Sequence, residues 1–189
     1  MSRACAERRL DLVDALATQA AYGVVTDLFG MPGPSWVTEL GLALPFARQH
    51  VGDLPADWLA AFKGERTADP GLTTMQVWTA VMVVDLIGNL QNQATLNALS
   101  RQAGSEMLIH VDSRLAEVRS RPAAAAGTLV GAFVANEALH EVQDLYKHVP
   151  AGEDWLKLYY QDISMILIEI LGSTLAVIPL TFASVMTSL

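Results

Sequence analysis

Apolar residues recur every three or four positions along most of the chain, which is the spacing of one helix face. The first such run extends from about Ala6 to Phe29. It ends at Gly30-Met31-Pro32-Gly33-Pro34, because proline cannot continue a helix and glycine permits a reversal. A second helix is predicted from a cap at Ser35 to about Phe46, and a short third helix follows a cap at Asp53. No strand-like alternation bounded by hairpin turns occurs in the sequence, so an all-α fold is predicted.

The longest predicted helix runs from Thr74 to Gln102. The segment Asp69-Pro70-Gly71 before it has the composition of a turn, and Thr73-x-x-Gln76 has the form of a capping box. The first half of this helix is apolar nearly all round, which is typical of a helix at the centre of a bundle. The pair Gly104-Ser105 is predicted to end it and to begin the next helix, which extends to Ser120.

The remaining sequence predicts one helix from Ala123 to His148 and an apolar stretch from Asp154 to Leu189. We expect two helices in that last stretch, broken near Gly172-Ser173 or kinked at Pro179. The whole pattern predicts a single helical domain over residues 1–189. It is a bundle of about seven or eight helices around a long central apolar helix.

Composition limits the partners. Hydrophobic residues make up 52% of the 189 residues and mean hydropathy is +0.32, so either a large core is buried or apolar surface is offered to a partner, a ligand or a lipid. The net charge of −8 excludes nucleic acid as a partner, because neutralising phosphates requires a basic stripe. The same charge disfavours binding to anionic membranes.

The compartment is predicted from the N-terminus and the single cysteine. Cys5 has no partner for an intrachain disulfide, which suits a reducing compartment. Glu7 and Asp11 interrupt any signal-peptide core, so a cytoplasmic protein is expected. The C-terminal run is long enough to span a bilayer. However, Glu169, Pro179 and the lack of basic flanks favour a buried core or a homodimer face over a membrane span.

A polar stripe lies on the long predicted helix. Its members are spaced four residues apart and share one face: Asp85, Asn89, Gln93, Asn97 and Arg101. A buried amide without a partner costs about 1–3 kcal/mol, so such groups are kept inside a protein when they hold a ligand or a polar network. For the last two, the solvent face of the helix is the favoured interpretation. Asp85, Asn89 and Gln93 are candidates for a binding site, together with Trp78 on the same helix.

Two carboxylate–histidine pairs have spacings that suit a metal. Glu137-x-x-His140 is the i, i+3 pair of helical di-metal proteins, and Glu106 with His110 is an i, i+4 pair. The alternative is that all four are solvated surface groups. Glu169 is a lone carboxylate in an apolar run, and if buried it would be protonated, paired or metal-bound. Phosphate-loop, Cys-x-x-Cys and nucleophile-elbow patterns are missing from the sequence.

Four segments in chain order resemble parts of cytochrome P450s. They are Asp11–Asp14 followed by Val24–Pro32, the segment Gly71-Leu72-Thr73-Thr74-Met75-Gln76, the segment Arg114–Pro122, and Glu137-Ala138-Leu139-His140. The resemblance implies a truncated P450-like helical core with a hydrophobic pocket beside its long helix. The family's haem-ligating cysteine loop has no counterpart, His140 stands for an arginine, and Asn89–Gln93 replaces the acid–threonine pair. Haem is therefore not expected.

These observations favour a helical protein that encloses a pocket for a hydrophobic small molecule. It is either a binder or a cofactor-free cyclase or isomerase of secondary metabolism, with Asp85 or Glu169 as acid or base through a pKa raised by burial. One alternative is an interaction protein that homo-oligomerises through its C-terminal apolar helices. The other is a di-metal carboxylate oxidase. The aromatic group Trp155, Tyr159 and Tyr160 is expected in the core or an interface.

Overall fold

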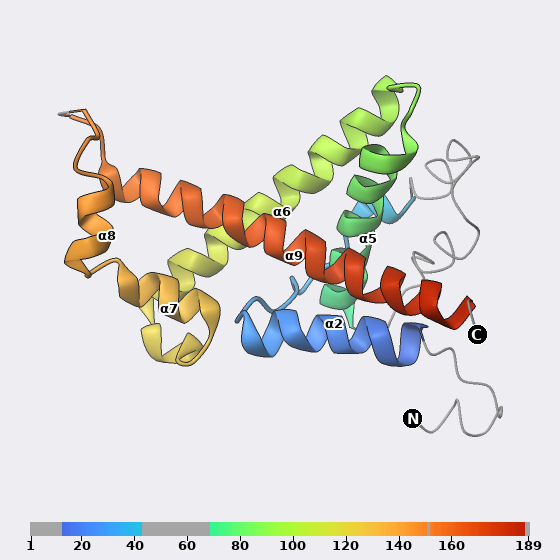
Figure 1. Cartoon of the computed structure of the whole chain (residues 1–189), viewed down its shortest axis with the longest axis horizontal. Coiled ribbons are helices and arrows are strands. Elements are labelled where there is room, and N and C mark those ends of the chain that lie inside the picture. Colours follow the sequence, from blue (N-terminus) through green and yellow to red (C-terminus); the bar gives the residue numbers. More distant parts are fainter. Residues whose placement is uncertain (1–12, 43–68, 151, 188–189) are drawn as a thin grey trace.

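The computed structural model describes residues 13–42, 69–150 and 152–187, and every regular element in these ranges is a helix (Figure 1). The all-α prediction is therefore confirmed for this part of the chain. The described residues contain six α-helices, joined by short π and 3₁₀ segments, against the seven or eight predicted for the whole chain. The predicted helix after Asp53, and Cys5, lie outside the described residues.

The N-terminal helix ends where the sequence predicted. The segments η1 (Val13–Thr18), α2 (Gln19–Gly23) and η2 (Val24–Leu28) follow one another without a gap. Gly30 then adopts a left-handed φ of 75°, and a Cβ on it would overlap the side chain of Thr128. Residues 35–38, where the second helix was predicted to begin, are not helical. Only the 3₁₀ turn η3 (Glu39–Leu42) forms within that prediction, and residues 43–46 lie outside the described residues.

The predicted helix from Thr74 to Gln102 is wrong, because the chain breaks inside it. Helix α5 (Pro70–Val83) continues as η4 (Val84–Gly88), and α6 (Ala94–Ser120) begins after a corner. Gly104 and Ser105, predicted to end a helix, lie within α6. The two helices form a hairpin whose corner stands at the top of the view in Figure 1.

The side chain of Asn89 builds this corner. Its Oδ1 accepts a hydrogen bond from the backbone N–H of Gln93 at 2.6 Å. The two N–H groups of its Nδ2 donate to Asp85 Oδ1 at 2.7 Å and to Asn97 Oδ1 at 2.8 Å, and the Gln93 carbonyl at 3.2 Å shares one of these protons. Asn92 takes a left-handed φ of 51°, which asparagine tolerates better than most residues. The polar groups that were spaced along one helix thus satisfy one another in a turn.

Helix α5 begins earlier than predicted, because Asp69 is its cap. The Asp69 carboxylate accepts from the N–H groups of Gly71 and Leu72, and Pro70 occupies the first turn. Asp69-Pro70-Gly71 is therefore a helix start rather than a turn. A Cβ on Gly33 would lie 2.5 Å from Gly71 Cα, so the two backbones touch there and leave no room for a side chain.

The predicted helix from Ala123 to His148 is divided into three pieces. They are η5 (Pro122–Ala125), α7 (Leu129–Asn136) and α8 (His140–Leu145). Gly127 has a φ of 81° and separates the first two, and Thr128 caps α7 by accepting from the Gly131 N–H at 3.2 Å. Leu139 is extended before α8.

Helix α9 (Trp155–Thr187) is a single helix that crosses the front of the molecule in Figure 1. The predicted break near Gly172-Ser173 is wrong, and the helix also continues past Pro179. The hydroxyl of Ser173 donates to the carbonyl of Glu169 at 2.7 Å, so its hydrogen-bonding need is met within the helix and does not break it.

The helix at the centre of the described residues is α6, which packs on α5, α7 and α9. Its buried side chains recur every three or four residues: Ala103, Met107, Val111, Leu115 and Val118. Helix α5 is buried on most sides, as predicted for its apolar half, and Trp78 is fully buried. From α9 the core receives Ile163, Leu167 and Leu171.

Replacing Asn89 by alanine should destabilise the α5–α6 corner, because its hydrogen bonds to Asp85, Asn97 and Gln93 are lost and the Gln93 N–H is left without its acceptor. We expect a loss of about 1–3 kcal/mol in the free energy of unfolding, measured by urea denaturation. Gln91→Ala is the matched control, because this exposed side chain on the same corner makes no hydrogen bond within the described residues. Equal stability of the two variants would contradict this role of Asn89.

Candidate functional site: a groove between α6 and α9

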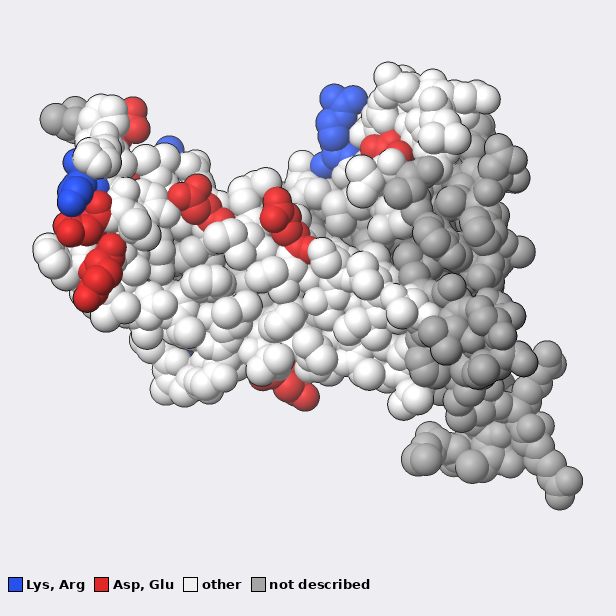
Figure 2. All heavy atoms as spheres, viewed as in Figure 1, with Lys and Arg blue, Asp and Glu red and all other residues white. Residues whose placement is uncertain are grey.

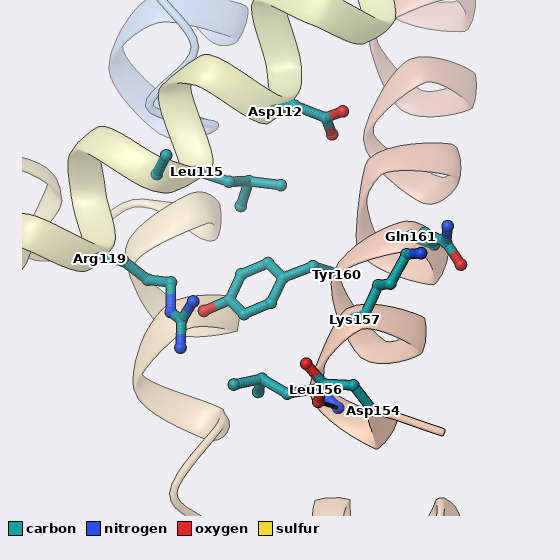
Figure 3. Close-up of a pocket in the computed structure, with 9 residues that line it drawn as sticks. Asp112, Leu115, Arg119, Asp154, Leu156, Lys157, Tyr160 and Gln161 are labelled. Carbon is teal, nitrogen blue, oxygen red and sulfur yellow. Dashed lines mark hydrogen bonds between the residues drawn. The ribbon is translucent and has the colours of Figure 1, made fainter. Parts of the chain in front are cut away.

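The best candidate site in the described residues is an open groove of about 420 Å³ between the C-terminal part of α6 and the start of α9 (Figure 3). Its apolar lining comes from Leu115 and Ala116 on α6 and from Leu156 and the Tyr160 ring on α9. Polar groups stand around this lining: Asp112, Arg119, Asp154, Lys157 and Gln161. The volume lies within the range of small-molecule sites, about 300–1,000 Å³.

A three-residue cluster holds one wall of the groove. Arg119 donates to both oxygens of Glu137 at 3.0 Å, and the hydroxyl of Tyr160 donates to Glu137 Oε2 at 2.6 Å. The Arg119 guanidinium also lies over the Tyr160 ring, 4.8 Å from its centroid. Figure 3 shows the Tyr160 ring reaching from α9 toward Arg119 on α6. The ring and the guanidinium are therefore fixed in place before any ligand arrives.

Electrostatics keep this cluster in one protonation state near neutral pH. Burial acts to raise the pKa of Glu137, but hydrogen bonds from Tyr160 and Arg119 outweigh it and lower the pKa below its usual value. Burial and the bond to Glu137 raise the pKa of Tyr160, and the bond to Glu137 raises that of Arg119. The cluster is thus a carboxylate, a phenol and a guanidinium.

The remaining polar groups of the groove carry both signs of charge. Asp112 accepts from the hydroxyl of Ser164 at 2.6 Å, and Asp154 accepts from the Leu156 N–H at the start of α9. Lys157 makes no hydrogen bond or ion pair with any residue that the structure describes, and its side chain is exposed. A cation at the rim is therefore available to a ligand without breaking an internal bond.

A second cavity, of about 540 Å³, lies over the η5–α7 segment. It is lined by small residues and one proline: Pro122, Ala123, Ala126, Gly127, Thr128, Gly131, Ala132 and Ala135. No charged side chain lines it, so it offers few groups that would orient a ligand.

The structure brings together Trp78 on α5 with Glu106 and His110 on α6, which the sequence offered for ligand or metal binding. Trp78 Nε1 donates to Glu106 Oε2 at 2.8 Å, and the Trp78 and His110 rings are 5.9 Å apart. The same Glu106 oxygen accepts from Thr38 at 2.7 Å, and its other oxygen accepts from Gln102 at 3.0 Å. Both carboxylate oxygens are thus already used to fasten the segment before η3 onto α5 and α6.

These bonds set the protonation of the pair. Burial acts to raise the pKa of Glu106, but the three hydrogen bonds prevail and lower it. Burial and the charge of Arg114 lower the pKa of His110, although its bond to the Pro32 carbonyl at 2.8 Å acts the other way. Because a carbonyl only accepts, the proton of neutral His110 belongs on Nε2.

The predicted polar stripe does not line either cavity. Asp85, Asn89 and Gln93 form the α5–α6 corner, partly buried and hydrogen-bonded to one another. Arg101 is exposed and bonds only to the carbonyl of Asn97 among the described residues. The corner network accounts for the amides without a ligand.

Glu169 does not meet the condition of burial that acid or base chemistry there requires, because it lies on the exposed side of α9, where its carbonyl accepts from Ser173. Glu137 and His140 do not share a helix, since α7 ends before the first and α8 begins at the second. His140 is exposed and lies 3.9 Å from Asp144. In the ranges that the structure describes, no three His, Cys, Asp or Glu side chains are grouped to hold a metal ion.

The sequence did not indicate Arg119 as a site residue, and it suggested His140 rather than Arg119 as the partner of Glu137. The two residues are 18 positions apart and meet only because the chain turns after α6, so no local spacing indicates them. Tyr160 was noticed with Trp155 and Tyr159 as core or interface. Tyr159 is buried as expected, and its hydroxyl donates to the Phe133 carbonyl at 2.6 Å.

No protein-family model, curated protein or solved structure matches the chain. The resemblance to cytochrome P450s therefore stays a prediction from the sequence.

The raised pKa of Tyr146, which bonds to Asp162 on α9, predicts a loss of stability at alkaline pH. Burial and a hydrogen bond to Asp162 raise the pKa of Tyr146 from 10.0 to about 12. The neutral phenol is favoured in the folded state, so its contribution is complete below pH 10 and is lost as the pH rises through about 12. We expect Tyr146→Phe to reduce the decline of the free energy of unfolding above pH 10, measured by urea titrations.

The matched control is Leu145→Ala, because the neighbouring Leu145 is exposed and does not titrate. It should keep the alkaline decline of the unmodified chain. An identical decline in Tyr146→Phe would contradict the assignment.

Proposed function

We propose that the protein binds a small amphipathic molecule in the groove between α6 and α9. The observation that carries this proposal is a cavity of ligand size in which apolar side chains and fixed polar groups converge. The apolar body of the ligand packs on Leu115, Leu156 and the face of Tyr160. Its polar end meets the charged rim.

The ligand that fits best carries a negative charge on an apolar body. Lys157 is unpaired within the described residues, and Arg119 uses Nε and Nη2 for Glu137, so its Nη1 makes no bond to another described residue. Asp112 and Asp154 already accept hydrogen bonds. An anionic group therefore gains an unused donor at either wall, Arg119 on α6 or Lys157 on α9, whereas a cation would compete with Ser164 and the start of α9 for the carboxylates.

The proposal is one of binding rather than turnover. Acid–base catalysis by Asp85 or Glu169 was expected from burial in an apolar interior. Glu169 is exposed, and Asp85 is bonded to Asn89 in the corner network. The groove therefore supports a proposal of ligand binding, and neither carboxylate supports a proposal of acid–base catalysis.

The test uses 8-anilinonaphthalene-1-sulfonate, a fluorescent probe with an apolar aromatic body and one sulfonate. It should bind the folded chain saturably, with one probe per chain. Ala116→Trp fills the groove from an exposed position on α6, and we expect it to weaken binding by at least about tenfold, which is 1.4 kcal/mol. Fluorescence titration measures the dissociation constant, and circular dichroism confirms that the variant remains helical.

Ala132→Trp is the matched control, because it places the same side chain at an exposed alanine of the second cavity. It should leave the probe's affinity unchanged. The groove is not the site if Ala116→Trp binds as tightly as the unmodified chain, or if Ala132→Trp abolishes binding.

A further inference from the structure

Helix α9 presents an exposed ridge from Lys157 to Thr181. Its residues are four apart, and every one is exposed: Lys157, Gln161, Met165, Glu169, Ser173, Val177 and Thr181. Ile166 and Ile178 flank this ridge and are also exposed. Figure 2 shows isolated acidic side chains standing in a wide uncharged surface along α9.

A lipid bilayer is a poor occupant for this face. The segment Trp155–Ile178 is long and apolar enough to cross a membrane, and 33% of its most apolar window is buried in the bundle, so it is charge that disfavours a bilayer. All three charged residues of α9 are on its exposed side: Lys157, Asp162 and Glu169. Placing an aspartate at the centre of a membrane helix costs roughly 2.5–3.5 kcal/mol, and the chain's net charge of −8 repels anionic lipids.

The order of charged residues along the ridge is complementary to the same ridge on a second copy of the chain. The first four residues of the ridge are Lys157, Gln161, Met165 and Glu169, so this part has a basic residue at one end and an acidic residue at the other. Turned end to end, this part of the ridge places acid against base at both of its ends and glutamine against methionine between them.

We propose that two copies associate through α9 about a two-fold axis close to residue 163. Lys157 pairs with Glu169 of the partner subunit, and Met165 packs on the partner's Gln161. A two-fold interface is self-complementary, so each of these contacts occurs twice. The helices cross at about 50°, the angle at which ridges of residues four apart run side by side.

The pairing of Lys157 with the partner's Glu169 has an electrostatic reason. The chains each carry −8 and repel one another at long range, so a contact that brings opposite charges together is favoured over one that brings two carboxylates together. Lys157 and Gln161 also stand at the rim of the groove, so the partner's Glu169 and the partner's Met165 lie beside the groove opening. In the dimer Lys157 is paired, and Arg119 Nη1 is the donor left for an anionic ligand. The association itself does not depend on the binding of a small molecule.

The experiment is sedimentation equilibrium on the full chain without any added probe. The unmodified chain should be a dimer. Lys157→Glu and Glu169→Lys each place like charges together at both ends of the interface, and each should raise the dissociation constant by at least about tenfold. The double variant K157E/E169K reverses both charges and should return the constant to within about threefold of the original, because the pairs are restored.

Two further variants distinguish this interface from non-specific hydrophobic association. Met165→Asp should leave a monomer, because it puts a carboxylate in the centre of the ridge. Leu86→Asp changes a leucine that is 83% exposed on η4, away from α9, and should leave the dimer intact. Circular dichroism checks that each variant is folded.

The proposal is overturned by a monomeric unmodified chain, or by charge reversals that leave the dissociation constant unchanged. A double variant as weak as the single ones overturns the pairing of Lys157 with Glu169 of the partner subunit. Flotation of the monomer with phosphatidylcholine vesicles would show that lipid covers the ridge instead.

Discussion

The structure depends on covering one apolar ridge of α6. Met107, Val111 and Leu115 lie on successive turns and are buried where α5 and α9 pack against the helix. Polar side chains on other faces of α6 bond to the rest of the chain. Arg114 donates to the Gly30 carbonyl at 2.9 Å and Glu106 accepts from Thr38, so the loop after the first helix is tied to the same element. A buried ridge and polar flanks on one helix therefore organise the described fold.

The type of the elements could be predicted from periodicity, but several ends could not. A helix stops where another bonding pattern is better, and at Asn89 that pattern involves the backbone of Gln93 four residues ahead, which apolar spacing does not reveal. Gly104 and Ser173 lie inside helices because packing on neighbours outweighs their weak propensity. Asp69 illustrates the converse, since a residue read as part of a turn satisfies two N–H groups of α5.

The candidate site was less accessible from sequence than the fold. Trp78, Glu106 and His110 were singled out separately, and the structure brings them together, but as a hydrogen-bonded support rather than an open site. The groove depends on Arg119 and Tyr160, which come from helices distant in sequence. Residues on one helix share a face by a simple rule of spacing, whereas the meeting of two helices follows from packing that no single segment encodes.

The contact between Gly33 and Gly71 has a consequence for how this sequence can change. Each position lacks room for a side chain because the other backbone fills the space, so a substitution at one is felt 38 residues away in the chain. The two glycines are adjacent to the segment that carries Trp36 and to the first turn of α5. Substitutions at Gly33 and Gly71 are therefore coupled. Even an alanine at either position requires the two backbone segments to move apart first.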